Sequence, residues 1–306
     1  MDLGYYPGCS LEGSSSEYNK SILAIAPLLG LNLKVVEDWN CCGATAAHNT
    51  NHDLAVALSL RNLALAEAQG IKELLAPCAA CSNRLIFAHK AATKDEQGRK
   101  KYEELIEMPY KGTVKILNLL EAIHLHGMEA LKANIKKPLT GIRVASYYGC
   151  LLVRPPKVIQ YDDPEAPKAM DEIVAALGCT PVDWEFKTEC CGGGFTMSRA
   201  DIVTRLAHEI LLGAKEAKAD LIVAACPMCQ TNLDLRQLAV QSEYNEQFNI
   251  PALFLSEVIG LALGLEPSAL GVTKHFIKVP ALEPKPVEAV KPKGKKAAVA
   301  ETTSKE

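Results

Sequence analysis

The sequence predicts an α/β fold built from two copies of one small, mostly parallel sheet with flanking helices. Two observations support this. Short apolar runs alternate with segments of helical spacing along most of the 306 residues, a pattern typical of parallel strands joined by right-handed crossovers. One cysteine pattern, a single cysteine, an adjacent pair and then CxxC, also occurs twice, which indicates a duplication. We therefore expect two similar halves related by a pseudo-two-fold axis.

The first half, residues 1–130, is predicted to form one domain with four strands and three helices. We expect strands at Leu3–Tyr6, Leu33–Val36, Leu74–Ala76 and Val114–Leu117. We expect helices at Ser21–Leu29, Asp53–Gln69 and Ser82–Ala92. Gly30 and Gly70 directly follow two of these helices, where glycine commonly ends a helix.

The second half, residues 141–270, repeats the order after a linker at 133–138. We expect strands at Arg143–Tyr147, Pro181–Trp184, Leu221–Ala225 and Ala252–Leu255. We expect helices at Pro167–Leu177, Met197–Lys218 and Met228–Val240. Residues 280–306 are rich in proline, lysine, alanine and glutamate and contain no aromatic residue, so we expect a disordered tail.

The composition is that of an ordinary globular protein, with 48% hydrophobic and 23% charged residues and a formal net charge of -3. This balance gives no sign of a nucleic-acid partner. The first residues lack the basic and apolar segments of a signal peptide, and no apolar run approaches the ~18 residues of a transmembrane segment. We therefore expect a cytoplasmic protein, in which many cysteines indicate metal or redox chemistry rather than disulfides.

Ten of the eleven cysteines belong to the repeated pattern, and each cysteine element directly follows a predicted strand. The two sets are Cys9, Cys41, Cys42, Cys78 and Cys81, then Cys150, Cys190, Cys191, Cys226 and Cys229. Because ligands collect at the carboxyl edge of a parallel sheet, the five thiols of each half should converge there. Each CxxC also opens a predicted helix, so both of its sulfurs share the first turn, where the partial positive charge favours thiolates. The remaining cysteine, Cys179, is expected to be a buried apolar residue.

Several explanations compete for these cysteines. An odd count and the absence of an export signal disfavour structural disulfides, and a thioredoxin-type dithiol would leave six of the ten cysteines without a role. Zinc needs four ligands, so five thiols in each half are one too many, although zinc in one half remains an alternative. An iron–sulfur cluster accounts for all five thiols if the cluster is open or expanded, because ordinary cubanes take four.

The pattern Cys-x31-Cys-Cys-Gly followed by CxxC, given twice, resembles the CCG domain found in the B subunit of heterodisulfide reductase, from Leu3 to about Leu265. The resemblance implies that each set of five cysteines holds one non-cubane 4Fe–4S cluster. It implies an oxidoreductase that reduces a disulfide, CoM-S-S-CoB of methanogens or an analogous one, by one-electron transfers from two clusters. The implied partners are the ferredoxin-like C subunit of such a reductase together with its flavin-carrying A subunit, which can be joined by a hydrogenase or dehydrogenase.

Two other functions remain open. Iron–sulfur subunits of glycolate and lactate oxidation complexes share CCG domains, so this chain can instead be an electron relay of a dehydrogenase complex. A zinc-stabilised interaction module is the third alternative. The fused ferredoxin motifs of many such relatives are absent here, so we expect electrons to arrive from another subunit.

Candidate residues around the clusters can be named from their spacing. His48, six residues after Cys42, and Lys187, three before Cys190, are candidate proton donors. The glycines expected to let backbone approach the sulfurs are Gly43, Gly192, Gly193 and Gly194. Basic side chains near the motifs that could pair with an anion are Arg84, Arg154, Lys157 and Arg199.

Overall fold

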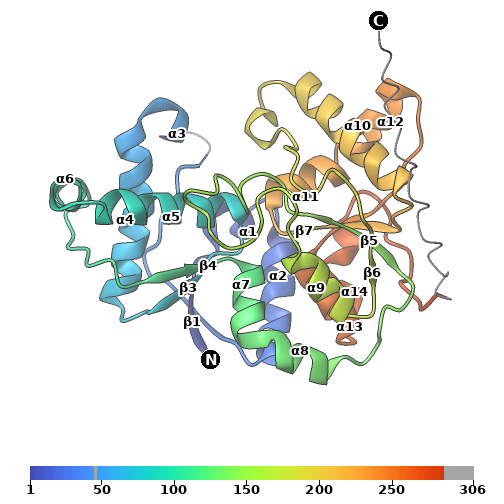
Figure 1. Ribbon diagram of the computed structural model, residues 1–306, viewed down its shortest axis with the longest axis horizontal. Helices are drawn as coiled ribbons and strands as arrows, with labels where there is room; N and C mark the ends of the chain where they lie inside the picture. Colours follow the sequence, from blue (N-terminus) through green and yellow to red (C-terminus); the bar gives the residue numbers. More distant parts are fainter. Residues whose placement is uncertain (45–46, 286–306) are drawn as a thin grey trace, which may run out of the picture.

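A computed structural model describes residues 1–44 and 47–285 and contains two four-stranded parallel sheets (Figure 1). The first sheet has the order β2-β1-β3-β4, with β1 Asp2–Tyr5, β2 Asn32–Val35, β3 Glu73–Leu75 and β4 Lys115–Leu117. The second has the order β6-β5-β7-β8, with β5 Arg143–Tyr147, β6 Thr180–Pro181, β7 Leu221–Ala224 and β8 Ala252–Phe254. The matching orders confirm the predicted duplicated α/β fold.

The strands of the second sheet differ in burial. All four residues of β7 are buried, as expected for a strand that is covered on both faces of a parallel sheet. The edge strand β6 is shorter than predicted, because Val182 donates one further hydrogen bond to the carbonyl of Val144 and pairing then ends. Pro181 has no amide hydrogen, which suits it only to an edge position.

The helices of the first half are α1 Gly8–Glu12, α2 Ser16–Ile25, α3 Ala47–Thr50, α4 His52–Ala68, α5 Ala79–Thr93 and α6 Glu96–Ile106. The helix predicted at Ser21–Leu29 begins earlier and ends at Ile25, because Pro27 cannot donate a helical hydrogen bond. A short 3-10 turn, Pro27–Leu29, and then Gly30 complete it. Helix α6 was not predicted; it begins at Asp95, whose carboxylate accepts a hydrogen bond from the amide of Gly98 at 2.7 Å.

The later helices are α7 Leu119–Ala122, α8 Met128–Asn134, α9 Ala169–Ala176, α10 Ala200–Glu216, α11 Pro227–Asp234, α12 Gln237–Tyr244, α13 Leu255–Ala262 and α14 Pro267–Leu270. A π-helical turn, Ile123–Gly127, joins α7 to α8, and short 3-10 turns lie at Gly193–Phe195 and Val272–Lys274. The single helix predicted at Met228–Val240 is in fact two, α11 and α12. The break lies beside Arg236, whose guanidinium donates a hydrogen bond to the carbonyl of Thr196.

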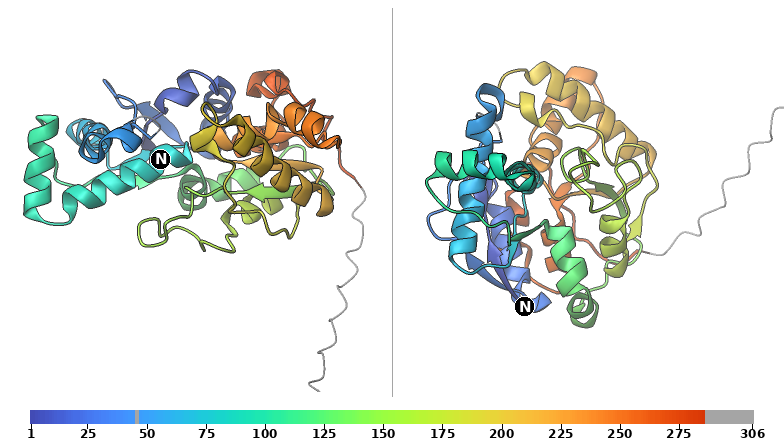
Figure 2. Two further views of the ribbon diagram at one scale, coloured as in Figure 1. Left: turned by 90° about the horizontal axis from the view of Figure 1, so that it is seen from above. Right: turned by 60° about the vertical axis from the view of Figure 1, so that its left-hand side comes forward.

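The two halves pack directly against each other, as the three views show (Figures 1 and 2). Helix α2 of the first half lies against α13 of the second, where the hydroxyls of Ser21 and Ser256 are 2.6 Å apart. The rings of Tyr18 and Phe254 stack in the same contact, with centroids 4.1 Å apart.

No helix among the described residues has the length and apolar character needed to cross a membrane.

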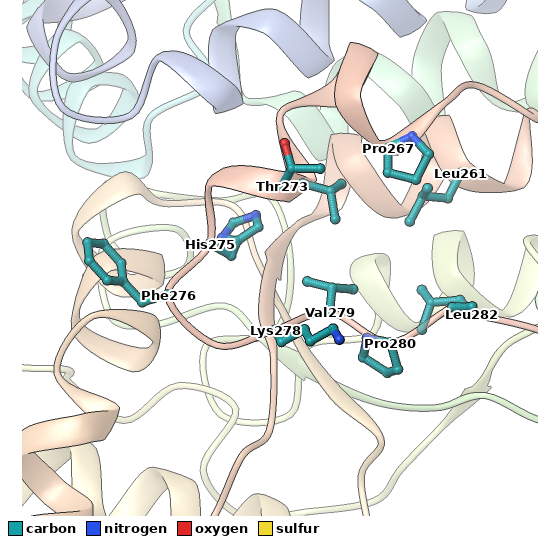
Figure 3. Close-up of a pocket in the computed structure, with 11 residues that line it drawn as sticks. Leu261, Pro267, Thr273, His275, Phe276, Lys278, Val279, Pro280 and Leu282 are labelled. Atoms are coloured by element: carbon teal, nitrogen blue, oxygen red, sulfur yellow. The ribbon is translucent and has the colours of Figure 1, made fainter.

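The chain after α14 returns along the second half. It borders a hollow of about 460 Å³ whose wall includes His275, Phe276, Lys278 and Leu282 (Figure 3). Within the segment predicted to be disordered, residues 280–285 lie against the second half, and the amide of Lys285 donates to the carbonyl of Thr140 at 2.7 Å. Residues 286–306 lie outside the described part of the chain.

A buried histidine fixes this returning segment. The Nε2 atom of His275 lies 2.8 Å from Oε2 of Glu257, and its Nδ1 atom lies 3.4 Å from Oδ2 of Asp234. Asp234 also accepts the amides of Phe276 and Ile277, each at 2.9 Å. Burial disfavours the charged imidazole, but the hydrogen bonds to Asp234 and Glu257 outweigh it and raise the pKa of His275 to about 10.

This ion-pair network predicts a pH-dependent stability. The folded pKa of about 10 exceeds the ordinary value of 6.5, so the stabilisation is fully present below pH 6.5 and is lost as the pH rises through about 10. We expect the free energy of unfolding to decrease over that range by at most about 1.4 kcal/mol per pH unit from this group. Replacing His275→Gln should remove this part of the slope, as measured by urea unfolding at several pH values.

The matched control is His52→Gln, which changes an exposed histidine at the start of α4 and should keep the wild-type slope. If His275→Gln and the wild type lose stability equally between pH 6.5 and about 10, the ion-pair account of this segment is wrong.

Candidate metal centres

Three cysteine-containing segments lie together at the carboxyl edge of each sheet. In the first half, Cys9 lies in α1 just after β1, the pair follows β2, and Cys78 caps the N-terminus of α5 just after β3. In the second half, Cys226 occupies the N-cap position of α11 and Pro227 the first helical position, where a residue without an amide hydrogen fits well. Parallel strand ends thus bring together thiols that are about seventy residues apart in the chain.

The sulfur atoms form close contacts within each half. In the first half, Sγ of Cys41 lies 3.7 Å from Sγ of Cys9, and Sγ of Cys42 lies 3.4 Å from Sγ of Cys81. In the second half, Sγ of Cys191 lies 3.6 Å from Sγ of Cys229. All eleven cysteines are free thiols.

The second half repeats the arrangement. Cys150 and Cys190, the counterparts of Cys9 and Cys41, lie close enough to shift each other's pKa, and so do Cys226 and Cys229. Each half therefore gathers its five thiols from three chain segments. Among residues 1–44 and 47–285, no group of three or more His, Cys, Asp or Glu side chains is arranged around a position for a single metal ion.

Each cysteine pair is held by its own tyrosine. The hydroxyl of Tyr6 donates to the carbonyl of Asn40, directly before the first pair, at 2.8 Å. The hydroxyl of Tyr147 donates to the carbonyl of Glu189, directly before the second pair, at 2.6 Å. Tyr6 and Tyr147 each lie three residues before the single cysteine of their half, so the duplication has kept both the residue and its contact.

Of the four glycines that the sequence analysis named, Gly43 and Gly192 donate their backbone amides to Sγ of Cys41 and Sγ of Cys190, both at 3.4 Å. Two further glycines, which it did not select, also lie against sulfurs. Gly8 has a φ of +70° and Gly149 a φ of +64°, in the left-handed region. A Cβ atom on Gly8 would lie 3.0 Å from Sγ of Cys81, and one on Gly149 would lie 2.9 Å from Sγ of Cys229. Any side chain here would therefore strain the backbone and displace a CxxC sulfur.

Hydrogen bonds favour the thiolate form at particular cysteines. The thiol of Cys150, followed by the amides of Gly192 and Gly193, lowers the pKa of Cys190 to about 6. In the first half, hydrogen bonds from the thiols of Cys41 and Cys81 hold the pKa of Cys42 well below its usual value. The same contacts raise the pKa of the partner thiols Cys41, Cys81 and Cys150, so they favour the thiolate, the form that binds metals, at one sulfur of each contact.

A cavity of about 230 Å³ lies between the halves. All five cysteines of the second set line it, and the first half contributes His48, Arg84 and the backbone around Ala79 and Ala80. The Nε atom of Arg84 is buried and has no hydrogen-bond partner among the described residues, and the guanidinium lies over the ring of Phe87, 5.7 Å from its centroid.

The structure separates the two candidate proton donors. His48 is exposed and lines the cavity. Lys187 does not line it: its ammonium forms an ion pair with Asp171 and donates to the carbonyl of Pro167 at 3.4 Å. The carbonyl of Lys187 instead accepts the amides of Tyr148 and Gly149, at 2.8 and 3.1 Å, and so supports the backbone before Cys150.

Of the four basic residues near the motifs, only Arg84 lines this cavity. Arg154 binds Glu165 at 2.7 Å and the hydroxyl of Thr188 at 3.0 Å. Arg199 forms a two-point ion pair with Asp201. Lys157 is exposed.

The two cysteine sets meet at the boundary between the halves. The thiols of Cys78 and Cys226 lie close enough to shift each other's pKa, upward for Cys78 and downward for Cys226, so the first cysteine of one CxxC neighbours the first cysteine of the other. Nearby, the side-chain amide of Asn83 donates to the backbone carbonyls of Leu151 and Arg154, both at 2.9 Å. The two candidate centres are therefore immediate neighbours.

Comparison with known proteins identifies relatives of this arrangement. Residues 3–86 and 144–234 match the family described as the cysteine-rich domain, CCG. Over 280 residues the chain is 33% identical to the 8-methylmenaquinol:fumarate reductase membrane anchor subunit of Wolinella succinogenes, covering 90% of this chain and 97% of that protein. It is 30% identical to the B subunit of the ferredoxin/F(420)H(2)-dependent CoB-CoM heterodisulfide reductase of Methanosarcina acetivorans, covering 90% and 94%.

A further relative and one solved structure agree. The chain is 34% identical to a protein of Archaeoglobus profundus described as similar to the heterodisulfide reductase B subunit, covering 86% of this chain and 91% of that protein. The crystal structure of a hypothetical protein from Helicobacter pylori superposes with a TM-score of 0.72 at 16% identity, covering 91% of this chain and 52% of that one, which supports the fold. The chain therefore belongs to the CCG cysteine-rich domain family, together with the B subunit of heterodisulfide reductase.

Proposed function

We propose that each set of five cysteines holds one non-cubane 4Fe–4S cluster. Two observations support this fit. All five thiols of the second set line one cavity, and the sulfurs of the first set lie in close contacts between its three segments. Thiolates are the usual ligands of iron–sulfur clusters, and a fifth thiolate exceeds what one cubane or one zinc ion takes.

The chain is then an iron–sulfur subunit of an oxidoreductase, and its reaction is the two-electron reduction of a disulfide. A disulfide takes up two electrons and two protons, its S–S bond breaks, and two thiols are released. When bound, the clusters would supply the electrons one at a time. The observation that supports this proposal is the cavity lined by all five second-set cysteines, at the boundary where Cys78 neighbours Cys226, because two one-electron centres there would both adjoin one bound disulfide.

The chain's own residues can bind and protonate such a substrate. His48 lines the cavity and is exposed to solvent, so its imidazole can pass a proton from water to a nascent thiolate. Lys187 has no comparable access, because it is paired with Asp171.

The surroundings of Arg84 favour an anionic disulfide. Arg84 and His48 also border a second hollow of about 350 Å³, whose other basic side chains are His52, Lys90 and Lys94. No acidic side chain lines this hollow, and its floor includes Val56 and Phe87. An apolar chain ending in a carboxylate, sulfonate or phosphate fits this lining, and CoM-S-S-CoB is one such molecule.

The electrons must come from other proteins. The relatives from Methanosarcina and Wolinella are named as subunits. We propose that the partners are a ferredoxin-like C subunit together with a flavin-carrying A subunit, in the cytoplasm. A reducing compartment is consistent with eleven free cysteines.

A second candidate function is an electron relay that does not itself break a disulfide. It is favoured by the 33% identity to the Wolinella fumarate reductase subunit, which matches over 97% of its length. A relay would need the two centres but would not need a cation such as Arg84 in the cavity.

We expect anaerobically purified protein to contain about eight iron atoms and as much acid-labile sulfide per chain. Cys150→Ser and Cys9→Ser should each lose about half of the iron, because each removes a ligand of one cluster only. The matched control is Cys179→Ala, since Cys179 is buried and lies outside both sets. Stoichiometric zinc with little iron would support the interaction module and contradict both redox functions.

The glycine contacts predict which backbone positions tolerate a side chain. Gly149→Ala should lose the second-half iron, because its Cβ would lie 2.9 Å from Sγ of Cys229. Gly30→Ala is the control, since Gly30 also has a φ of +70° but has no atom within 4 Å of its Cβ position. It should cost about 1–2 kcal/mol of stability from backbone strain alone and keep its iron. Equal iron in both variants would show that this close approach is unimportant.

Disulfide reduction coupled to reduced benzyl viologen tests the function. We expect reduction of both the anionic disulfide dithiodiglycolate and neutral hydroxyethyl disulfide. Arg84→Gln should raise the KM for the anionic substrate about tenfold, the loss of one charge-assisted hydrogen bond, and leave the KM for the neutral one unchanged. The control is Arg99→Gln, which removes an exposed charge from α6. Iron-loaded protein that reduces neither disulfide would favour the relay.

A further inference from the structure

One buried tyrosine contacts both CxxC loops. The hydroxyl of Tyr18, in α2, lies 3.2 Å from the carbonyl of Pro77 and 3.3 Å from the carbonyl of Ala225. These carbonyls directly precede Cys78 and Cys226, the first cysteines of the two CxxC motifs. A phenol has one proton to donate, so this single donor is shared between a loop of each half.

The ring of Tyr18 is itself held from both sides. It is fully buried, with an exposed fraction of 0%, and it stacks on Phe254 of the second half with an angle of 7° between the rings. One helical turn further along α2, the hydroxyls of Ser21 and Ser256 meet at 2.6 Å. Tyr18 is therefore packed against both halves, and a displacement of either half would displace its hydroxyl.

Tyr18 differs in this respect from the tyrosines that repeat. Tyr6 holds the loop before the cysteine pair of the first half only, and Tyr147 holds that of the second half only. Tyr18 belongs to the first half, yet it contacts the second-half loop at nearly the same distance as its own. Tyr6 thus contacts a loop of the first half, Tyr147 a loop of the second half, and Tyr18 a loop of each.

We propose that the hydroxyl of Tyr18 is a positioning group for both metal centres, which sets the separation of the two CxxC loops and with it the redox potentials of both. This inference rests on the proposed function, because it requires a cluster in each half. Its physical basis is that cluster potentials respond to hydrogen bonding and charge close to the ligating sulfurs. A change at a carbonyl next to Cys78 or Cys226 acts within one residue of such a sulfur.

The test is an anaerobic redox titration of the iron-loaded full chain, followed by EPR. Tyr18→Phe removes the hydroxyl and keeps the ring stacked on Phe254. We expect the midpoint potentials of both centres to shift in this variant. Tyr6→Phe should shift only the first-half centre and Tyr147→Phe only the second, so these two variants also assign the two waves. Tyr5→Phe is the control, because the Tyr5 hydroxyl bonds only to Asn19, at 2.7 Å, and should shift neither.

The outcomes separate this inference from the proposed function. Wild-type protein without iron would refute the two-cluster function itself. If wild type and Tyr18→Phe both hold full iron, unchanged potentials, or a shift of the first-half centre alone, would overturn the shared role of Tyr18. Loss of iron from both halves in equal measure would support it, and loss from the first half alone would count against it.

A second variant covers the case in which Tyr18→Phe does not fold. Phe254→Leu removes the ring stacked on Tyr18 from the second half and leaves the hydroxyl in place. Because the Tyr18 ring would then be less firmly held, its hydroxyl should shift relative to both carbonyls, and both midpoint potentials should change in the same direction. A shift of the second-half centre alone would contradict the proposal.

Discussion

The contact between the two CxxC loops is the constraint on which the rest of the structure depends. Cys78 and Cys226 can meet only if both sheets present their carboxyl edges to the same boundary. The packing of α2 against α13 maintains that orientation. The Tyr18 hydroxyl lies at this boundary, against a carbonyl of each half. Joining two copies of one fold thus produces a site between them that neither half contains alone.

Within each half, function imposes costs that the fold has to offset. Buried thiols such as Cys42 and Cys191 lie where a core would otherwise hold larger apolar side chains. Gly8 and Gly149 adopt left-handed conformations beside a sulfur, and glycine loses more conformational freedom on folding than other residues. The burial of apolar side chains between the sheets and the surrounding helices offsets these costs in stability. The same burial keeps water from six of the ten sulfurs, those of Cys42, Cys78, Cys81, Cys191, Cys226 and Cys229, which strengthens the hydrogen bonds around them.

Much of the fold and the convergence of the cysteines could be predicted from the sequence, for a physical reason. Apolar periodicity is local, so the eight strands and the helices that open at Cys78 and Cys226 are readable in it. Contacts made by single polar side chains over long separations are not. Nothing local marks Tyr18 as a partner of Ala225, 207 residues away, or distinguishes the Asp171-paired Lys187 from a free lysine. The capping pattern Asn118-x-x-Glu121 does indicate the start of α7, so that helix could have been predicted.

We propose that ten sulfurs form two neighbouring iron–sulfur centres, one in each half. Anomalous diffraction at the iron edge, from crystals grown without oxygen, is the decisive measurement. We expect two separate groups of iron atoms, each surrounded by the five cysteines of one half, on either side of the neighbouring Cys78 and Cys226. A single metal ion in either half, or iron bound by cysteines from only one half, would contradict this proposal.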